Sequence, residues 1–340
     1  MLYVTTRNNR DAFTAYRALQ ENRAADGGLY LPMRMPVFTQ EEINALGERS
    51  FGQNVADVLN RLFKTKLSSW DIDFCIGRCP VRLAPLRHRI LMAETWHNPQ
   101  WNYAWVVNNL VSLLCDETVV PGNWAKISVR IAVLFGIFGE LKRMEISKAD
   151  ISVVSGDFSA PISAWYARLW GLPIGNIICC CNENHSLWDL LCHGQLRTDA
   201  LSIPTMTPEA DVVVPENLER LVYESGGIGE VERYLAACRE GKNYWTTDTV
   251  LAKLRKGMHV SVVSSTRLEP TIMGVYRTNN YVLDPYSALA YAGLLDYRAK
   301  TGETQHAIVL SEQSPLCNLE ATAKAMNMVP ETLKGFLAQH

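Results

Sequence analysis

The sequence lacks a marked excess of charge of either sign. Its 340 residues carry 33 Lys and Arg against 35 Asp and Glu, which gives a formal net charge of −2. A nucleic-acid-binding protein would show a basic face or stripe, and an anionic membrane surface would also require basic residues. We therefore expect neither nucleic acid nor a membrane as a partner.

Long apolar runs are also missing. The most apolar stretch, residues 131–138, is preceded by Arg130 and is far shorter than the roughly 20 residues that span a bilayer. The first residues, Met1 to Arg7, do not show the basic-then-apolar layout of a signal peptide. These absences predict a cytoplasmic protein.

The nine cysteines form no metal-binding pattern. Cys75 and Cys79 have no second pair downstream, and Cys179–Cys181 are consecutive. On a strand, three consecutive side chains point to alternate faces, so they cannot share one metal. We expect reduced, buried thiols and no metal site.

Apolar periodicity predicts helices in the first part of the chain, over residues 12–22, 41–49, 51–63, 102–114 and 124–143. Strand-type runs follow at 151–154, 176–181, 258–264 and 306–310. They alternate with helical patterns at 159–170, 184–193, 215–224, 230–240 and 286–300. This alternation predicts an α/β fold with a parallel sheet covered on both faces. Residues 75–85 and 202–208 are predicted linkers, and 226–229 a glycine turn.

A series of short motifs runs through the chain in a fixed order. Near the start come Tyr-Val-Thr-Thr-Arg at 3–7, Ala-Asp-Gly-Gly-Leu-Tyr-Leu-Pro at 25–32 and Phe-Gly-Gln-Asn-Val-Ala at 51–56. Further motifs lie at 155–158, 171–174, 182–184, 217–221 and 284–288. The series resembles the threonine synthase family of fold-type-II pyridoxal-phosphate (PLP) enzymes. The resemblance implies a tryptophan synthase β-like sheet, with a helical N-terminal region at 1–95 and the PLP-enzyme-like α/β domain at 96–340.

The chain departs from the family at the positions that the resemblance assigns to the cofactor. The PLP lysine position is Ala104, and the next lysine downstream is Lys126. The phosphate loop carries Asp157, Ser159 and Ala160, and the C-terminal motif becomes residues 312–317. About a hundred residues, roughly a small domain, are missing at about 115–122. We therefore expect no cofactor and no working PLP-dependent threonine synthase.

Four polar residues are the catalytic candidates of the inherited cleft: Glu94, His97, Asp157 and Glu312. His97 beside Glu94 forms an acid/base pair, or is a family relic bonded to the backbone. Glu312 is a general acid with a pKa raised by burial, or pairs with an arginine such as Arg267 or Arg277. Asp157 binds a cation or amine, or caps the helix that begins at 159.

A second group is expected to contact the substrate: Trp96, Asn98, Trp101, Tyr103, Ser155, Asn182, Asn184, His185 and Asp284. The rings of Trp96, Trp101, Tyr103 and Trp105 form an aromatic pocket, or fill the volume left by PLP and the missing domain. The two interpretations differ in whether a ligand-sized cavity survives.

Three functions remain open. The preferred one is a PLP-independent enzyme, repurposed for a small amino-acid-like or carboxylate substrate in a biosynthetic pathway. The alternatives are a non-catalytic binding or regulatory pseudoenzyme, and a PLP-dependent threonine synthase or related lyase. Loss of the small domain would expose apolar surface around residues 110–114 and 131–138, which predicts a homodimer.

Overall fold

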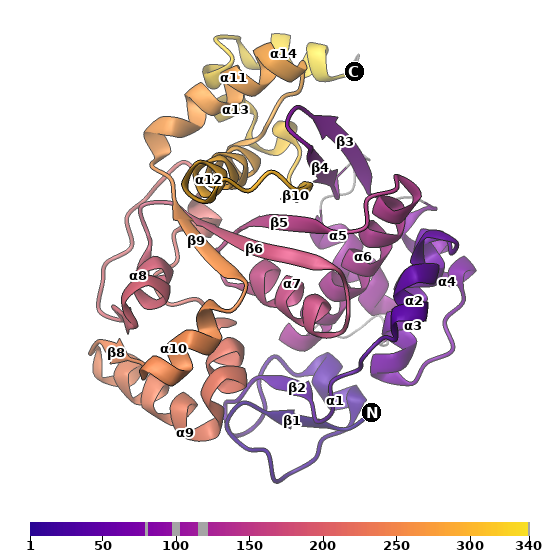
Figure 1. Cartoon of the computed structure of the whole chain (residues 1–340), viewed down its shortest axis with the longest axis vertical. Coiled ribbons are helices and arrows are strands. Elements are labelled where there is room, and N and C mark those ends of the chain that lie inside the picture. Colours follow the sequence, from indigo (N-terminus) through magenta and orange to yellow (C-terminus); the bar gives the residue numbers. More distant parts are fainter. Residues whose placement is uncertain (79–80, 97–102, 115–121, 339–340) are drawn as a thin grey trace.

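The computed structural model describes residues 1–78, 81–96, 103–114 and 122–338 (Figure 1). Within them a six-stranded sheet has the order β3-β4-β10-β5-β6-β9. All neighbouring strands are parallel except β3 and β4, which are antiparallel. The strands are β3 (Arg82–Leu86), β4 (Ile90–Glu94), β5 (Ala149–Val154), β6 (Ile174–Cys181), β9 (Met258–Val262) and β10 (Ala307–Ser311). Two antiparallel pairs lie apart from it: β1 (Tyr3–Thr5) with β2 (Tyr30–Pro32), and β7 (Gln195–Leu196) with β8 (Tyr244–Trp245).

Helices supply most of the remaining structure. The α-helices up to the first long strand of the sheet are α1 (Ala15–Gln20), α2 (Gln40–Asn44), α3 (Phe51–Phe63), α4 (Ser69–Ile76), α5 (Tyr103–Ser112) and α6 (Asn123–Arg143). Those that follow are α7 (Ser159–Leu169), α8 (Ser186–His193), α9 (Leu218–Glu240), α10 (Asp248–Arg255), α11 (Leu268–Asn279), α12 (Pro285–Thr301), α13 (Leu319–Ala325) and α14 (Pro330–Leu337). Short 3₁₀ turns cover Ala45–Gly47, Pro208–Ala210, Ser265–Arg267 and Pro315–Asn318.

Helices cover both faces of the main sheet. The alternation along β6 shows the two layers, because Cys179 and Cys181 belong to one apolar cluster, while Cys180 belongs to the other. The cluster of Cys179 includes α6 and α7, and that of Cys180 includes α12. The β1–β2 pair lies at one end of the molecule, and α11, α13 and α14 lie at the other (Figure 1). The predicted α/β fold with a sheet covered on both faces is therefore confirmed.

Local capping explains why several predicted helices form where they do. The pattern at 51–63 becomes α3, which starts with a capping box: Ser50 Oγ accepts from the Gln53 amide, and the Gln53 side chain accepts from the Ser50 amide. The patterns at 215–224 and 230–240 become the two halves of α9, which join across a kink at Gly227 (φ 72°, ψ −167°), within the predicted glycine turn at 226–229. A positive φ combined with a ψ near 180° is adopted almost only by glycine, so the kink falls on that residue.

The region up to residue 95 differs from its expected helical character. Residues 82–94 form β3 and β4 of the main sheet, and β4 pairs with β10, more than 200 residues away in sequence. The predicted linker at 75–85 therefore runs into a strand. These strands were missed because β4 is continuously apolar and buried, a pattern that periodicity alone cannot assign.

The apolar surface that suggested a dimer is covered within the chain. Leu110 and Val111 of α5 are buried, as is the run from Ile131 to Phe138 on α6. The homodimer stays a prediction, and exposed apolar surface on these helices no longer supports it. None of the described helices is both long and apolar enough to cross a membrane. All seven cysteines within the described ranges are free, and these ranges hold no cluster of metal-ligating side chains.

Close packing of α3 on α6 gives the first prediction. A Cβ at Gly136 would lie 2.5 Å from the ring of Phe51, so Gly136→Ala should lower the free energy of unfolding by about 1–3 kcal/mol. Gly274 of α11 has no atom within 4 Å of its Cβ position, so Gly274→Ala should raise it by about 0.5–1 kcal/mol. Urea unfolding of both variants checks this. Equal effects of the same sign would contradict the close approach of α3 and α6.

Candidate functional site

A depression lies at the carboxyl ends of β5 and β10, where ligands bind in open α/β sheets. It has two adjoining lobes, of about 460 and 710 Å³, which share Arg130, Asp157 and Glu312 among their lining residues. We call the two lobes together the Arg130 cavity. The volume of each lobe is within the range of small-molecule sites. A ligand-sized cavity therefore survives beside Tyr103, so the aromatic side chains do not fill the whole space.

The central charged groups of the cavity are Arg130 on α6 and Glu312, which directly follows β10. The two form a bidentate ion pair, with one contact between Arg130 Nη2 and Glu312 Oε2 of 3.1 Å. The guanidinium also lies 4.1 Å from the ring centroid of Tyr103, a cation–π contact. Burial lowers the pKa of Arg130, but Glu312, Tyr103 and Asp157 together raise it more strongly, so Arg130 stays charged. The salt-bridge interpretation of Glu312 is the one that the structure shows, with Arg130 instead of Arg267 or Arg277 as its partner.

Asp157 lies on the loop between β5 and α7, facing both lobes. Its Oδ1 accepts a hydrogen bond from the Ser159 amide at 2.9 Å, which is the helix-capping contact. The backbone oxygen of Asp157 accepts from the Asn217 amide at 3.0 Å. Ser155 lines the smaller lobe next to this loop. The loop is therefore held in place by α7 on one side and by the start of α9 on the other.

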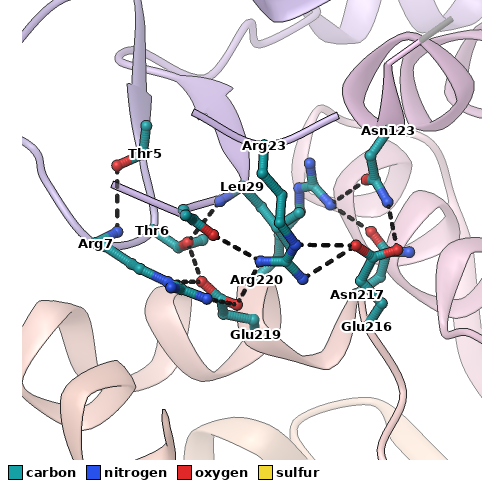
Figure 2. Close-up of polar contacts among 12 residues, drawn as sticks. Thr5, Thr6, Arg7, Arg23, Leu29, Asn123, Glu216, Asn217, Glu219 and Arg220 are labelled. Atoms are coloured by element: carbon teal, nitrogen blue, oxygen red, sulfur yellow. Dashed lines mark hydrogen bonds and ion pairs between the residues drawn. The ribbon is translucent and has the colours of Figure 1, made fainter. Parts of the chain in front are cut away.

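A buried polar network supports this wall of the cavity (Figure 2). Arg220, which is fully buried, donates to the Tyr30 backbone oxygen at 2.9 Å, to Asn123 Oδ1 at 2.6 Å and to Asn217 Oδ1. Asn123 and Asn217 both line the larger lobe. Burial lowers the pKa of Arg220 to about 10, which leaves it protonated at neutral pH. Arg220 therefore connects the N-terminal strand pair to two side chains of the cavity.

The neighbouring Glu219 joins the same strand pair to α9. It accepts from Thr6 and from Arg7, whose Nε lies 3.1 Å from Oε1, and its Oε2 lies 3.1 Å from Arg23 (Figure 2). Burial raises the pKa of Glu219, but the contacts with Arg7 and Thr6 lower it more strongly, so the carboxylate is charged. The partners are more than 190 residues from Glu219 in sequence.

Glu94 lies outside the Arg130 cavity. It is the last residue of β4, is 1% exposed, and accepts from Tyr281 Oη at 2.7 Å, with Arg82 at 3.8 Å. Burial raises its pKa, against the opposing effects of Tyr281 and Arg82. Its expected partner His97 lies outside the described residues, as do Asn98 and Trp101.

Asp284 and Trp96 also lie apart from the cavity lining. Asp284 is the N-cap of α12, where it accepts from the amides of Tyr286 and Ser287 and from the Ser287 hydroxyl. Ser287 Oγ lies 2.8 Å from Ser311 Oγ, which can donate to it, and Trp96 Nε1 donates to Ser311 Oγ at 2.8 Å. Their polar atoms therefore hold α12 and the end of β4 against β10.

The side chains of Asn182 and Asn184 form hydrogen bonds with the loop at 203–211. Asn182 Nδ2 donates to Thr207 and Asp211, at 3.0 and 2.7 Å, and Asn184 Nδ2 donates to the Ile203 backbone oxygen at 2.8 Å. His185 begins α8, half-exposed, with Asp189 at 3.8 Å. None of these three side chains is among the lining residues of the Arg130 cavity. Their substrate contacts stay predictions that the geometry does not favour.

Several lining residues were not among the sequence candidates: Arg130, Lys126, Asn123, Ser159, Glu209, Asn217, Tyr286 and Gln313. A signal existed for Arg130, which is a cation at the start of the most apolar stretch of the chain. A charge in such a position is buried and must find a partner. That argument identifies the residue as unusual, although it does not identify Glu312 as the partner.

Comparison with known proteins finds similar sequences and similar folds among threonine synthases. The family model described as threonine synthase N terminus matches residues 2–79. A threonine synthase from Brucella melitensis superposes with a TM-score of 0.83 at 20% identity, covering 96% of this chain and 91% of that one. The yeast threonine synthase also gives 0.83, at 17% identity, covering 96% and 90%. The resemblance to threonine synthases is confirmed. At these identities, the structural likeness shows the fold alone.

Curated relatives match shorter regions of this threonine synthase-like chain. The threonine synthase of Pseudomonas aeruginosa is 28% identical over 205 residues, which are 60% of this chain and 43% of that protein. Human threonine synthase-like 1 is 30% identical over 148 residues, 42% of this chain and 20% of that protein. The chain thus spans less than half the length of these relatives. The expected loss of the small domain falls mainly on 115–121, outside the described residues, and stays a prediction.

The expectation of no cofactor is wrong for the family that the chain resembles. The Brucella structure is described as a PLP-bound threonine synthase, which points to PLP as the family cofactor. The expectation rested on Ala104 at the lysine position, on the changed phosphate loop and C-terminal motif, and on the missing small domain. It left out Arg130 and Lys126, which line the same space.

Asp284 gives a pH-dependent prediction. Burial raises its pKa to about 6 from an ordinary value of 3.8, so the folded state binds its proton more tightly than the unfolded state. The resulting stabilisation is complete below about pH 4 and is lost as pH rises through about 6. Asn is also a good N-cap, so Asp284→Asn keeps the cap and removes the titration.

We expect the stability of the wild type relative to Asp284→Asn to fall by about 2 kcal/mol between pH 4 and pH 7. Urea unfolding of both proteins across this range measures the difference in stability. The contributions of the other titrating groups are the same in both proteins and cancel. A difference that is constant with pH would show that the Asp284 pKa is not raised in the folded state.

Proposed function

We propose that this threonine synthase-like chain is an enzyme that takes a small amino-acid-like or carboxylate substrate into the Arg130 cavity. The Arg130–Glu312 ion pair carries this proposal, because it places fixed charges of both signs at the base of a cavity of ligand size. A solid cleft would have favoured a non-catalytic binding protein. The cavity supports the enzymatic alternative.

The arrangement of charge suits a zwitterion. Arg130 and Lys126 provide cations for a carboxylate, and Arg130 has the planar fork that binds carboxylates in a bidentate manner. Glu312, Asp157 and Glu209 provide anions for an ammonium group. A substrate carboxylate would compete with Glu312 for Arg130, and Glu312 would then be released to accept from the ammonium. The pair would thus orient the substrate.

The donor set of the cavity also fits PLP. Lys126 supplies an amine, Arg130 with the hydroxyls of Ser155 and Ser159 suits a phosphate, and Glu312 suits a protonated ring nitrogen. These residues would hold the cofactor in the cavity. When bound, PLP supplies an electron-withdrawing ring that stabilises negative charge developing on the substrate.

The donors are not those that the resemblance assigns. The first amide of α7 is already bonded to Asp157 Oδ1, and Pro161 has no N–H to offer a phosphate. Arg130 and Lys126 are therefore the groups that favour an anion in this cavity. A change of donors together with a retained cavity supports a reaction other than threonine formation. The biosynthetic pathway, like the reaction, belongs to this proposal.

A matched pair of double variants tests the substrate class. Arg130→Gln with Glu312→Gln removes both charges of the cavity pair and leaves no unpaired buried charge. Arg267→Gln with Asp296→Gln does the same to an exposed ion pair elsewhere, with contacts of 2.6 and 2.9 Å. The probes are L-threonine, L-homoserine and succinate, titrated by calorimetry. Native mass spectrometry of the purified wild type identifies any ligand that it retains.

The wild type should bind at least one probe, and the cavity variant should bind it at least about tenfold more weakly, about 1.4 kcal/mol. The Arg267 and Asp296 variant should bind it as the wild type does. Equal affinity in all three proteins would contradict a role of the ion pair. The wild type binding no probe and retaining no small molecule would contradict the proposed substrate class.

A further inference from the structure

Two helices form one wall of the larger lobe of the Arg130 cavity. On α6, Asn123, Lys126, Ile127 and Arg130 line it, which is the i, i+3, i+4, i+7 pattern of one helical face. On α5, Ala104 lines the same lobe. The side chain at the position that the resemblance assigns to the PLP lysine and the Lys126 side chain therefore border the same space.

Lys126 differs from the other cation of that face in having no partner. Arg130 is paired with Glu312, whereas the Lys126 amine makes neither an ion pair nor a hydrogen bond with the described residues. Its side chain is exposed on the cavity wall. A lysine of this kind keeps a compact amine on a flexible four-carbon stem, and it can move within the lobe without breaking a hydrogen bond or ion pair with those residues.

We infer that Lys126 has taken over the amine function that position 104 lacks, and that it bonds covalently to the aldehyde of a pyridoxal phosphate held in the Arg130 cavity. The inference deepens the proposed function, since it rests on PLP entering the same cavity. The amine has moved from one helix to the facing helix, while the space that both helices enclose has been retained.

The covalent step balances without another reactant. The neutral Lys126 Nζ attacks the aldehyde carbon, and the carbonyl oxygen leaves as water after taking up the two protons of the amine. The product is a carbon–nitrogen double bond between Lys126 and the cofactor. Borohydride converts this bond to a stable secondary amine by adding hydride to carbon and a solvent proton to nitrogen.

The test is site-resolved labelling of the full-length chain. The protein is incubated with PLP, reduced with borohydride and digested, and the pyridoxyl label on each lysine is quantified by mass spectrometry. Lys126 should carry at least about ten times the label of Lys148, an exposed lysine outside the cavity. Lys126→Arg, which keeps the charge, should abolish the dominant label. Lys148→Arg should leave it unchanged.

A rescue variant tests directly whether positions 104 and 126 border the same lobe. Adding Ala104→Lys to Lys126→Arg should restore a dominant label at position 104, because both positions border the same lobe. Equilibrium dialysis should show that Lys126→Arg still binds PLP reversibly, which excludes misfolding as the cause of the lost label.

Label distributed evenly over the surface lysines would overturn the inference, and so would an unchanged dominant label in Lys126→Arg. If no lysine is labelled while the Arg130 and Glu312 double variant still loses affinity for the amino-acid or carboxylate probes, the relocated amine is wrong and the proposed substrate class stands. If labelling succeeds but none of those probes binds, the proposed substrate class fails on its own.

Discussion

The N-terminal strand pair, the start of α6 and the loop before α7 all depend on one buried guanidinium, that of Arg220. A fully desolvated cation is costly unless its donors are satisfied. Arg220 meets that demand with acceptors on β2, on α6 and at Asn217, the N-cap of its own helix, and Asn217 in turn donates to Asp157 in the loop before α7. The contacts are directional, so they restrain the relative positions of those segments. The wall of the Arg130 cavity that holds Asn123 and Asn217 is placed by this requirement.

Local patterns in the sequence predicted those parts of the fold that local physics decides. Capping residues and apolar periodicity were enough for α3, α6 and the parallel strands β5, β6, β9 and β10. They were not enough for β3 and β4, because the partner of β4 is β10 and the pairing is invisible in a local window. The glycine turn predicted at 226–229 corresponds to the kink at Gly227, across which the two helical halves of α9 join without an intervening loop.

The candidate site shows the same division. Asp157, Ser155, Tyr103 and Glu312 could be placed in the cavity because they lie at strand ends or in motifs of known order. Asn182, Asn184 and Asp284 lie at strand or helix ends as well, but their polar atoms are used by the neighbouring backbone and loops. A position at the end of a strand therefore predicts that a residue lies near the cavity. It does not predict whether the side chain points into the cavity. Arg130 was missed because its partner, Glu312, is 182 residues away along the chain.

The kink at Gly227 has a consequence for how the sequence can diverge. The first half of α9 carries Glu219 and Arg220, whose geometry is restrained by many long-range contacts. The half that follows the kink contacts β8, where Tyr244 donates to Glu230 and Arg233 donates to the Trp245 backbone oxygen, at the periphery of the molecule (Figure 1). Because regular helical geometry is interrupted between them, a change in the tilt of the outer half need not turn the inner half. The exposed positions of the outer half, such as Glu232, are thus freer to accumulate substitutions over evolutionary time, whereas its buried Val231 and Tyr234 stay restrained by the core.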